Sequence, residues 1–189
     1  MFNHIHQGSL MGSNHTAGIN AKLKVSIQPN IGLDGDARKS IMEILNTILA
    51  DEAVLTMKTR SAHWHLSGPG FLELGILFDQ QFDQLNTISN ETAERVRMMG
   101  GSPISSFKEC LNYTRLKEQQ YEMPNIMGLL ADHEASVRFM REDARKCLEE
   151  YEDHGTYALF IHFIGLHEKM AWILRAYIGT EVGLDGKQV

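Results

Sequence analysis

Hydrophobic residues recur every three or four positions over four long stretches of the chain. This spacing places them along one side of an α-helix and therefore predicts four long helices. The expected helices cover about residues 36–64, 71–99, 123–153 and 155–180. Asp36 is the expected N-cap of the first helix, and Gly-Pro clusters follow the first two helices. No stretch alternates as a strand does, so we predict an all-α four-helix bundle.

A long connection, residues 100–122, joins the second and third predicted helices. It is long enough to cross the bundle, and its residues 106–113 are expected to form a short helix. We expect the bundle over residues 31–182, with a short C-terminal tail over 183–189. Residues 1–30 are rich in Gly, Asn, Ser and His without periodicity, and are predicted to be a mobile N-terminal tail. A hypothesis of weak metal binding by this tail rests on its histidines, His4, His6 and His15.

The composition is that of one soluble domain with a substantial core. The chain has 189 residues, of which 43% are hydrophobic and 22% charged. The sequence has no run of about 18 apolar residues and no signal-peptide pattern at its start, so we expect no membrane span and a cytoplasmic protein. Two cysteines are too few for a disulfide framework, which agrees with a reducing compartment. The net charge of −6 argues against a broad nucleic-acid surface.

Five polar residues form a narrow stripe on the second predicted helix. They follow one another at spacings of four, three, four and four: Asp79, Asp83, Asn86, Asn90 and Glu94. The pattern alone favours a solvated face opposite the core. The alternative is a carboxylate-lined wall that meets another helix or chain, and carboxylates with imidazoles suit iron. The helix lacks a Glu-x-x-His motif, and the adjacent His167 and Glu168 point to different faces of the last helix.

Two separated blocks of the sequence resemble the Dps family, the mini-ferritins. The resemblance covers about residues 36–180. In the first block the matching residues are Arg60, His63-Trp64, Gly68-Pro69, Phe71, Leu77-Phe78-Asp79, Ala93-Glu94-Arg95 and Gly100-Gly101-Ser102-Pro103. In the last helix they are Thr156, His167-Glu168-Lys169-Met170 and Trp172.

This resemblance implies a ferritin-like four-helix subunit, with a short helix in the crossover connection, that assembles as a hollow homo-dodecamer. It implies a ferroxidase that oxidises Fe(II) with hydrogen peroxide or oxygen and stores ferric iron in the cage, protecting against oxidative damage. In the family, the di-iron or mono-iron site lies between two chains. One chain supplies two histidines and a carboxylate, and its partner supplies two carboxylates.

Transferred to this chain, the family's ligand set is incomplete. His63 stands at the first histidine position, but Gly75 stands at the second. Asp79 and Glu94 keep two of the carboxylates, whereas Asn90 replaces the third. A glycine offers no ligand, and a neutral amide is a poor ligand for iron. We therefore expect His63, Asp79 and Glu94 to be the catalytic metal ligands.

Two other histidines could replace the missing ligands. His162 is expected on an inward-facing ridge of the last helix, near the space that Gly75 opens. It is either a metal ligand or an ordinary core histidine with polar partners. His65 is either a metal ligand or a cap of the first helix. The other residues considered are expected to have no part in the chemistry: Trp64 in the core, His167 outside the ligand set, and His133 and His154 at the surface.

The sequence thus favours an iron-oxidising cage with an altered intersubunit site. The alternative is a non-catalytic structural or metal-binding cage whose ferroxidase site is degenerate, with zinc as a competing metal. DNA binding is expected to be weak or absent, because the N-terminal tail carries only Lys22 and Lys24 and the chain is acidic.

Overall fold

Four long helices and one short helix make up the described part of the chain. The computed structural model describes residues 28–118 and 124–181, and in these ranges it contains no strand. The helices are α1 (Gly35–Trp64), α2 (Phe71–Met98), α3 (Phe107–Tyr113), α4 (Ile126–Glu149) and α5 (His154–Glu181). The predicted all-α architecture is confirmed, and the helix ends agree with the prediction within four residues. The tail histidines His4, His6 and His15 lie outside the described residues.

The N-cap of the first helix lies two residues earlier than predicted. Asp34, not Asp36, is the N-cap: it has an extended backbone, and its Oδ1 accepts a hydrogen bond of 2.7 Å from the Ala37 N–H. Asp36 lies in the first turn, where a carboxylate interacts favourably with the positive end of the helix dipole. The short helix α3 begins with a capping box between Ser106 and Glu109.

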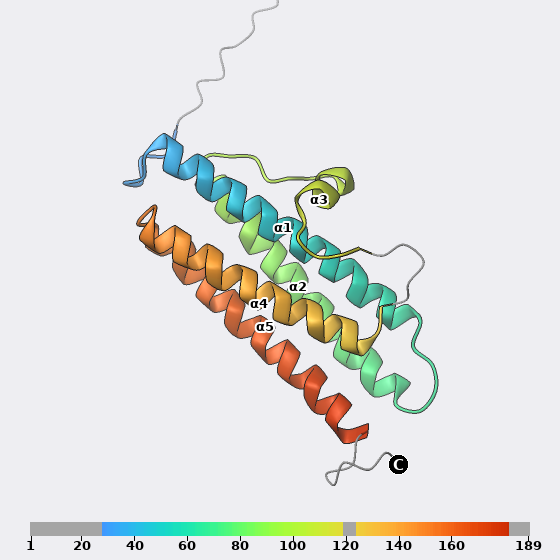
Figure 1. Cartoon of the computed structure of the whole chain (residues 1–189). Helices are drawn as coiled ribbons and strands as arrows, with labels where there is room; N and C mark the ends of the chain where they lie inside the picture. The colour runs from blue at the N-terminus through green and yellow to red at the C-terminus, as the bar shows by residue number, and fades with distance from the viewer. Residues whose placement is uncertain (1–27, 119–123, 182–189) are drawn as a thin grey trace, which may run out of the picture.

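The hydrophobic core lies between the four long helices. Contacts are most extensive between α1 and α2 and between α4 and α5, and Figure 1 shows the four helices side by side. Because the connection after α2 crosses the bundle, α4 runs in the same direction as α2. The largest fully buried side chains come from all four helices, and include Ile41, Leu45, Ile48, Leu85, Ile88, Leu129, Met140, Phe160, Phe163 and Leu174.

Arg115 links the crossover to two helices of the bundle. The Arg115 guanidinium donates to Asp51 on α1 at 2.9 Å and to Asp143 on α4 at 2.7 Å, and both carboxylates are buried. Asp51 also accepts from the Arg115 backbone N–H at 2.6 Å. Burial raises the pKa of Asp143, although the nearby Arg115 opposes this rise. The described part of the connection, up to residue 118, is therefore attached to α1 and α4 through buried ion pairs.

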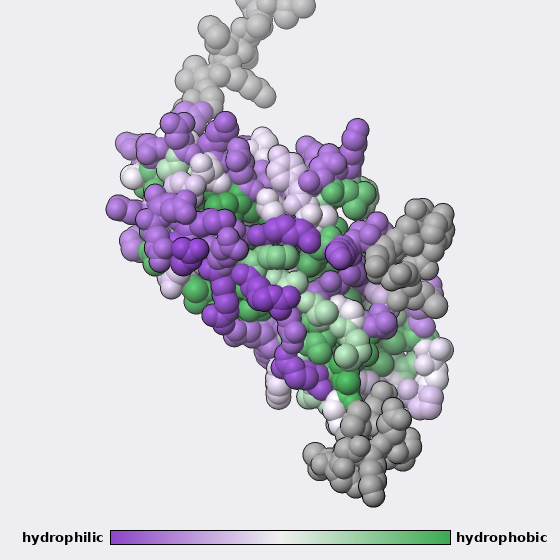
Figure 2. Space-filling view, in the orientation of Figure 1, coloured by the Kyte–Doolittle hydropathy of each residue, from purple (hydrophilic) through white to green (hydrophobic). Residues whose placement is uncertain are grey.

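Polar and apolar side chains are unevenly distributed over the surface. The face shown in Figure 2 is mainly polar toward the end where α1 begins, and more apolar toward the opposite end. At the junction of α1 and α2, four large apolar side chains are 50–64% exposed: Trp64, Phe71, Leu72 and Ile76. Trp64 is therefore not in the core of the subunit, contrary to expectation. None of the described helices is long and apolar enough to cross a membrane.

Candidate functional site

His63 and Asp79 meet where α1 ends and α2 begins. His63 lies in the last turn of α1, and the short loop that follows reverses the chain so that Asp79 on α2 comes alongside. The His63 Nδ1 is 2.7 Å from the Asp79 Oδ1, and their side chains are 36% and 66% exposed. A carboxylate on one ring nitrogen orients an imidazole and leaves the other nitrogen for a metal. This pair brings together two of the expected ligands.

The reversal depends on glycine at position 70. Gly70, the N-cap of α2, has φ = 78°, in the left-handed region that side chains disfavour. A Cβ at this position would lie 2.5 Å from the Tyr177 Oη of α5. The positive φ and the close tyrosine hydroxyl both favour glycine in this turn, which brings Asp79 on α2 back beside His63.

Gly75 lies directly beside the free nitrogen of His63. A Cβ at position 75 would be 3.8 Å from the His63 Nε2 and 3.9 Å from the Leu66 Cδ1. A longer side chain at this position would therefore contact the ring nitrogen that Asp79 does not engage. The absence of a side chain leaves this side of His63 open in the subunit.

Asn90 and Glu94 lie on the same exposed stripe of α2, far from His63. Asp79, Asp83, Asn90 and Glu94 are all exposed, which agrees with the predicted polar face. Fifteen residues separate Asp79 from Glu94, which corresponds to about 22 Å along a helix. The two carboxylates therefore cannot bind one metal ion within a single chain. Among the described residues, no group of three or more His, Cys, Asp or Glu side chains is placed to hold a metal.

His65 contributes to the end of α1. It is the C-cap residue of that helix, and its backbone N–H donates to the Ala62 carbonyl. Its Nδ1 lies 2.7 Å from the Ser61 carbonyl oxygen, so the ring also caps the last turn. The residue is exposed, and Nε2 takes no part in this hydrogen bond.

His162 does not point into the bundle, contrary to expectation. Its side chain is exposed, while its neighbours Phe163 and Ile164 occupy the core. Because α5 turns by 100° per residue, the buried stripe passes through Phe163 and His167 and leaves His162 outside. Contacts of Arg95 with Thr156 and of Gln81 with Met170 align α2 and α5, and place His162 near the level of Asn90. His162 is thus several turns from His63 and Gly75.

The interior contains a polar cluster that the sequence did not reveal. His133, expected at the surface, is fully buried, and its Nδ1 lies 3.0 Å from the His167 Nδ1. The His167 Nε2 lies 3.0 Å from a carboxylate oxygen of Glu52, and both residues are also fully buried. Burial and the neighbouring His167 hold the pKa of His133 well below its usual value. Helical spacing could have indicated the burial of His133, because this residue lies four positions after Leu129 and seven before Met140, on the buried stripe of α4.

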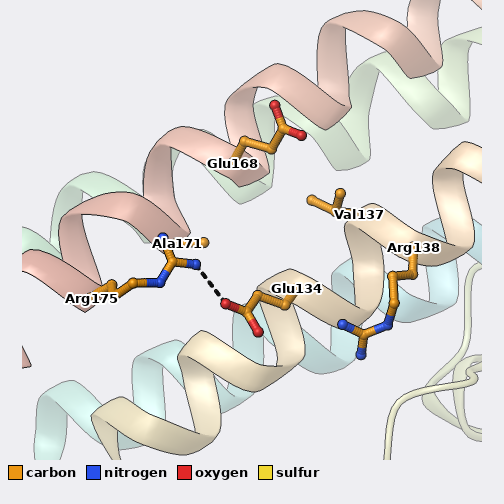
Figure 3. A pocket seen from close by; sticks show the side chains of 6 residues that line it. All are labelled: Glu134, Val137, Arg138, Glu168, Ala171 and Arg175. Atoms are coloured by element: carbon orange, nitrogen blue, oxygen red, sulfur yellow. Dashed lines mark hydrogen bonds and ion pairs between the residues drawn. The ribbon is translucent and has the colours of Figure 1, made fainter.

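A shallow pocket of about 300 Å³ lies on the outside, between α4 and α5. Figure 3 shows Glu134 and Arg138 of α4 opposite Glu168 and Arg175 of α5. Arg175 is paired with Glu134 at 2.6 Å, and Glu168 is paired with Arg141 at 2.5 Å. Since these charges largely neutralise one another, the pocket has no converging set of free ligands like that expected at a metal site.

Comparison with known proteins gives a consistent result. A family model described as a ferritin-like domain matches residues 42–181. An uncharacterized low temperature-induced protein of Nostoc sp. is 35% identical over 164 residues, which are 84% of this chain and 92% of that protein. The DNA protection during starvation protein 2 of Bacillus anthracis is 29% identical over 143 residues, 74% of this chain and 97% of that protein.

Solved structures agree with these relatives. Dps from Vibrio cholerae O1, described as a member of a broad superfamily of ferritin-like diiron-carboxylate proteins, has a TM-score of 0.73 and 29% identity. That match covers 80% of this chain and 96% of the other. Dps from Listeria monocytogenes has a TM-score of 0.69 and 27% identity, over 74% of this chain and 93% of the other.

Proposed function

Because the chain belongs to the Dps family of ferritin-like proteins, we propose that it forms a homo-dodecameric cage that binds, oxidises and stores iron. Iron is the substrate and the cargo. Two Fe(II) ions give one electron each to hydrogen peroxide, the O–O bond breaks, and two hydroxide ions form. The Fe(III) then enters the cage as hydrated ferric mineral. Oxygen is the alternative oxidant.

The observation that carries the proposal is the division of the polar stripe into two half-sites. His63 with Asp79 forms one half, and Asn90 with Glu94 forms the other, about 22 Å further along α2. A two-fold axis near Asn86, midway between them, would set the first half of one chain against the second half of its partner. Such a symmetric contact produces two equivalent sites.

The apolar surface beside His63 supports a partner subunit at this place. Trp64, Phe71, Leu72 and Ile76 are each at least half exposed in the single chain. A cluster of exposed large apolar side chains is typical of an interface. Covering them would also remove water from the iron site, where low dielectric strengthens ligand interactions.

In this site, His63 binds iron through Nε2, and Asp79 and Glu94 supply negative charge. Asp79 either orients His63, as in the single chain, or turns toward the metal when iron is present. Gly75 removes one ligand and leaves a position for water or oxidant. His162 stands near the level of Asn90 and would supplement the second half-site, whereas His65 would have to give up its bond to Ser61.

The test is iron oxidation by the full-length protein. After anaerobic Fe(II) loading, peroxide or oxygen is added and ferric absorbance is followed. We expect at least a tenfold faster peroxide reaction than in a His63→Ala, Glu94→Ala double variant. Asp83→Asn, on the same exposed stripe but outside both half-sites, is the matched control and should keep the wild-type rate.

The second candidate is a non-catalytic cage that binds metal, which Gly75 and Asn90 favour. Equal oxidation rates in the wild type and the double variant would support it. Native mass measures the assembly separately: a stable monomer would contradict the cage itself. Anomalous diffraction from iron-soaked crystals tests the substitute ligands, and a metal that leaves both His162 and His65 unbound would remove them from the site.

A further inference from the structure

A line of three buried polar side chains joins α1, α5 and α4 through the middle of the bundle. Glu52 lies 3.0 Å from one nitrogen of His167, and the other nitrogen of His167 lies 3.0 Å from His133. All three residues have no exposed surface. The contact with Glu52 is within ion-pair distance, although its angle is not that of an aligned hydrogen bond. Buried groups of this kind are costly unless their charges and protons are balanced.

The protons of this trio can be counted. A Nδ1–Nδ1 contact of 3.0 Å requires one proton between the two rings. If His133 donates it, the single N–H of neutral His167, on Nε2, faces Glu52, and the trio carries a buried charge of −1. If His167 donates it, a bare Nε2 would oppose the carboxylate unless one more proton lies between them. The arrangement with the extra proton is neutral overall.

The surroundings also favour an added proton. Buried oxygens and nitrogens without a hydrogen-bond partner lie near the trio, and come from α1, α2 and α4: Glu52 Oε2, Thr56 Oγ1, Gln81 Oε1, His133 Nε2 and Ser136 Oγ. With Glu52 charged, the Glu52 and Gln81 oxygens can only accept a hydrogen bond, the two hydroxyls can accept or donate, and His133 Nε2 does one or the other according to its tautomer, so acceptors outnumber donors here. Deep burial penalises an uncompensated carboxylate more than a neutral acid or an ion pair.

Nearby formal charges do not compensate the trio. Asp51 pairs with Arg115, Asp132 pairs with Lys58, and Glu168 pairs with Arg141. Each of these carboxylates is adjacent in sequence to a member of the trio, and each is already paired with a cation. From α2 the group packed against this region is Gln81, which is uncharged and donates to the Met170 carbonyl at 3.2 Å. The balance must therefore come from within the trio.

We infer that Glu52, His167 and His133 form a buried proton-binding site that takes up one proton per subunit. The proton enters at a ring nitrogen and ends between Glu52 and His167, either as a carboxylic acid or as a carboxylate–imidazolium pair. Two edges of the His167 ring hold Glu52 and His133 apart, so the three donors do not surround one point as metal ligands would. The site is independent of the proposed iron chemistry.

The site makes the packing of four helices depend on pH. Loss of the proton leaves a buried negative charge between α1, α4 and α5, so the folded state is weakened as pH rises. The sign follows from linkage: a folded state that binds more protons than the unfolded state loses stability with increasing pH. His133 is neutral in the folded state and protonates below about pH 6.5 in the unfolded chain, which acts in the opposite sense at acidic pH, so the cage would be firmest near neutral pH.

The test is a comparison of proton binding by intact cages. Wild type, Glu52→Gln and Glu168→Gln are titrated between about pH 5 and pH 8, the range of histidine switches. We expect the wild type and Glu168→Gln to bind about one more proton per subunit than Glu52→Gln. Equal proton binding by all three proteins would overturn the inference.

Infrared difference spectra of the wild type give a readout that needs no folded Glu52→Gln protein. Lowering the pH should produce a carboxylic-acid signal well above about pH 4.3, where exposed glutamates titrate, or an imidazolium signal that a His167→Gln variant lacks while it keeps those of the exposed histidines. In His133→Gln the signal should shift its midpoint by at least half a pH unit. Absence of any such signal, or an unchanged midpoint in His133→Gln, would contradict the site.

Discussion

At the scale of single residues, burial determines which side chains can react. Cys147 is fully buried on α4, and burial, followed by the nearby Asp153 and Asp143, raises the pKa of its thiol to about 12. Only the thiolate is a good nucleophile. At pH 8 the thiolate fraction is therefore about one in ten thousand, far below that of an ordinary cysteine.

We therefore predict that Cys147 resists alkylation in the folded protein. Iodoacetamide at pH 8, followed by mass spectrometry of peptides, should modify Cys147 only after denaturation. Cys110, which is partly exposed on α3, should react first even though burial also raises the pKa of its thiol. Modification of Cys147 at the rate of Cys110 would show that α4 opens more readily than its packing suggests.

Arg115 is the residue on which the crossover depends most. Its replacement by alanine would leave Asp51 and Asp143 buried without a cation. Removal of one partner from a buried ion pair costs about 3–5 kcal/mol, and we expect the lower end because Arg115 is 28% exposed. Melting curves at equal subunit concentration measure the loss. Arg145→Ala is the matched control: its pair with Glu149 at 3.3 Å is exposed, and its loss should cost about 0.5 kcal/mol or less.

The histidines show how far residue-level prediction from sequence can go. His63 and Asp79, both expected as ligands, lie side by side because a recognisable turn separates them and brings α2 back along α1, whereas their metal binding stays a prediction. His133 and His162 were each placed on the wrong side of their helix. Imidazole is polar enough for the surface and small enough for the core. An error of one residue in the assumed buried face of the helix therefore moves a histidine from one environment to the other. The partner of His133 in the core is His167, 34 residues later in the chain, and such a partner cannot be read from local spacing.

At the scale of elements, the turn between α1 and α2 is expected to tolerate few substitutions at its glycines. Gly68 and Gly70 both have positive φ, 86° and 78°, but only Gly70 is crowded, by Tyr177. Gly68→Ala should cost about 1–2 kcal/mol, the price of a left-handed alanine. Gly70→Ala should cost about 1–3 kcal/mol more, because its Cβ would overlap the tyrosine hydroxyl.

The two contributions at Gly70 can be separated with Tyr177→Phe. Without the hydroxyl, the nearest ring atom is 3.8 Å from the new Cβ, an ordinary contact. In that background, Gly70→Ala should cost no more than Gly68→Ala does in the wild type, as measured by denaturant melts of all five proteins. An undiminished cost in the Tyr177→Phe background would mean that the contact with Tyr177 is not the cause.

Helix existence was predictable from sequence, whereas helix boundaries and orientation were less so. Apolar spacing located all four long helices, and the SFKECLNY segment formed the expected short one. The N-cap shifted from Asp36 to Asp34 because two aspartates near one helix start have similar capping chemistry. How the crossover is anchored, through Arg115 and two distant carboxylates, depends on long-range pairing that periodicity does not encode.

At the scale of the whole molecule, the proposed iron site needs two chains, and this requirement can be tested by mixing variants. A His63→Ala cage and a Glu94→Ala cage each have every site damaged. In a mixed pair, one of the two sites combines His63 from one chain with Glu94 from the other, while the second site lacks both. If chains pair at random, half of the pairs are mixed, so about one quarter of all sites become intact.

We therefore predict that co-assembled His63→Ala and Glu94→Ala chains regain about a quarter of the wild-type peroxide-driven oxidation rate, although each variant alone is nearly inactive. Co-expression, or unfolding and joint refolding, supplies the mixed cages, and native mass spectrometry verifies their composition. The control pairs His63→Ala with the double variant, which can form no intact site. Recovery above that control requires a site shared between subunits. Within one chain His63 lies beside Asp79, at one end of the stripe, and Glu94 lies at the other end. No recovery in verified mixed cages would mean that iron is oxidised without pairing the two half-sites.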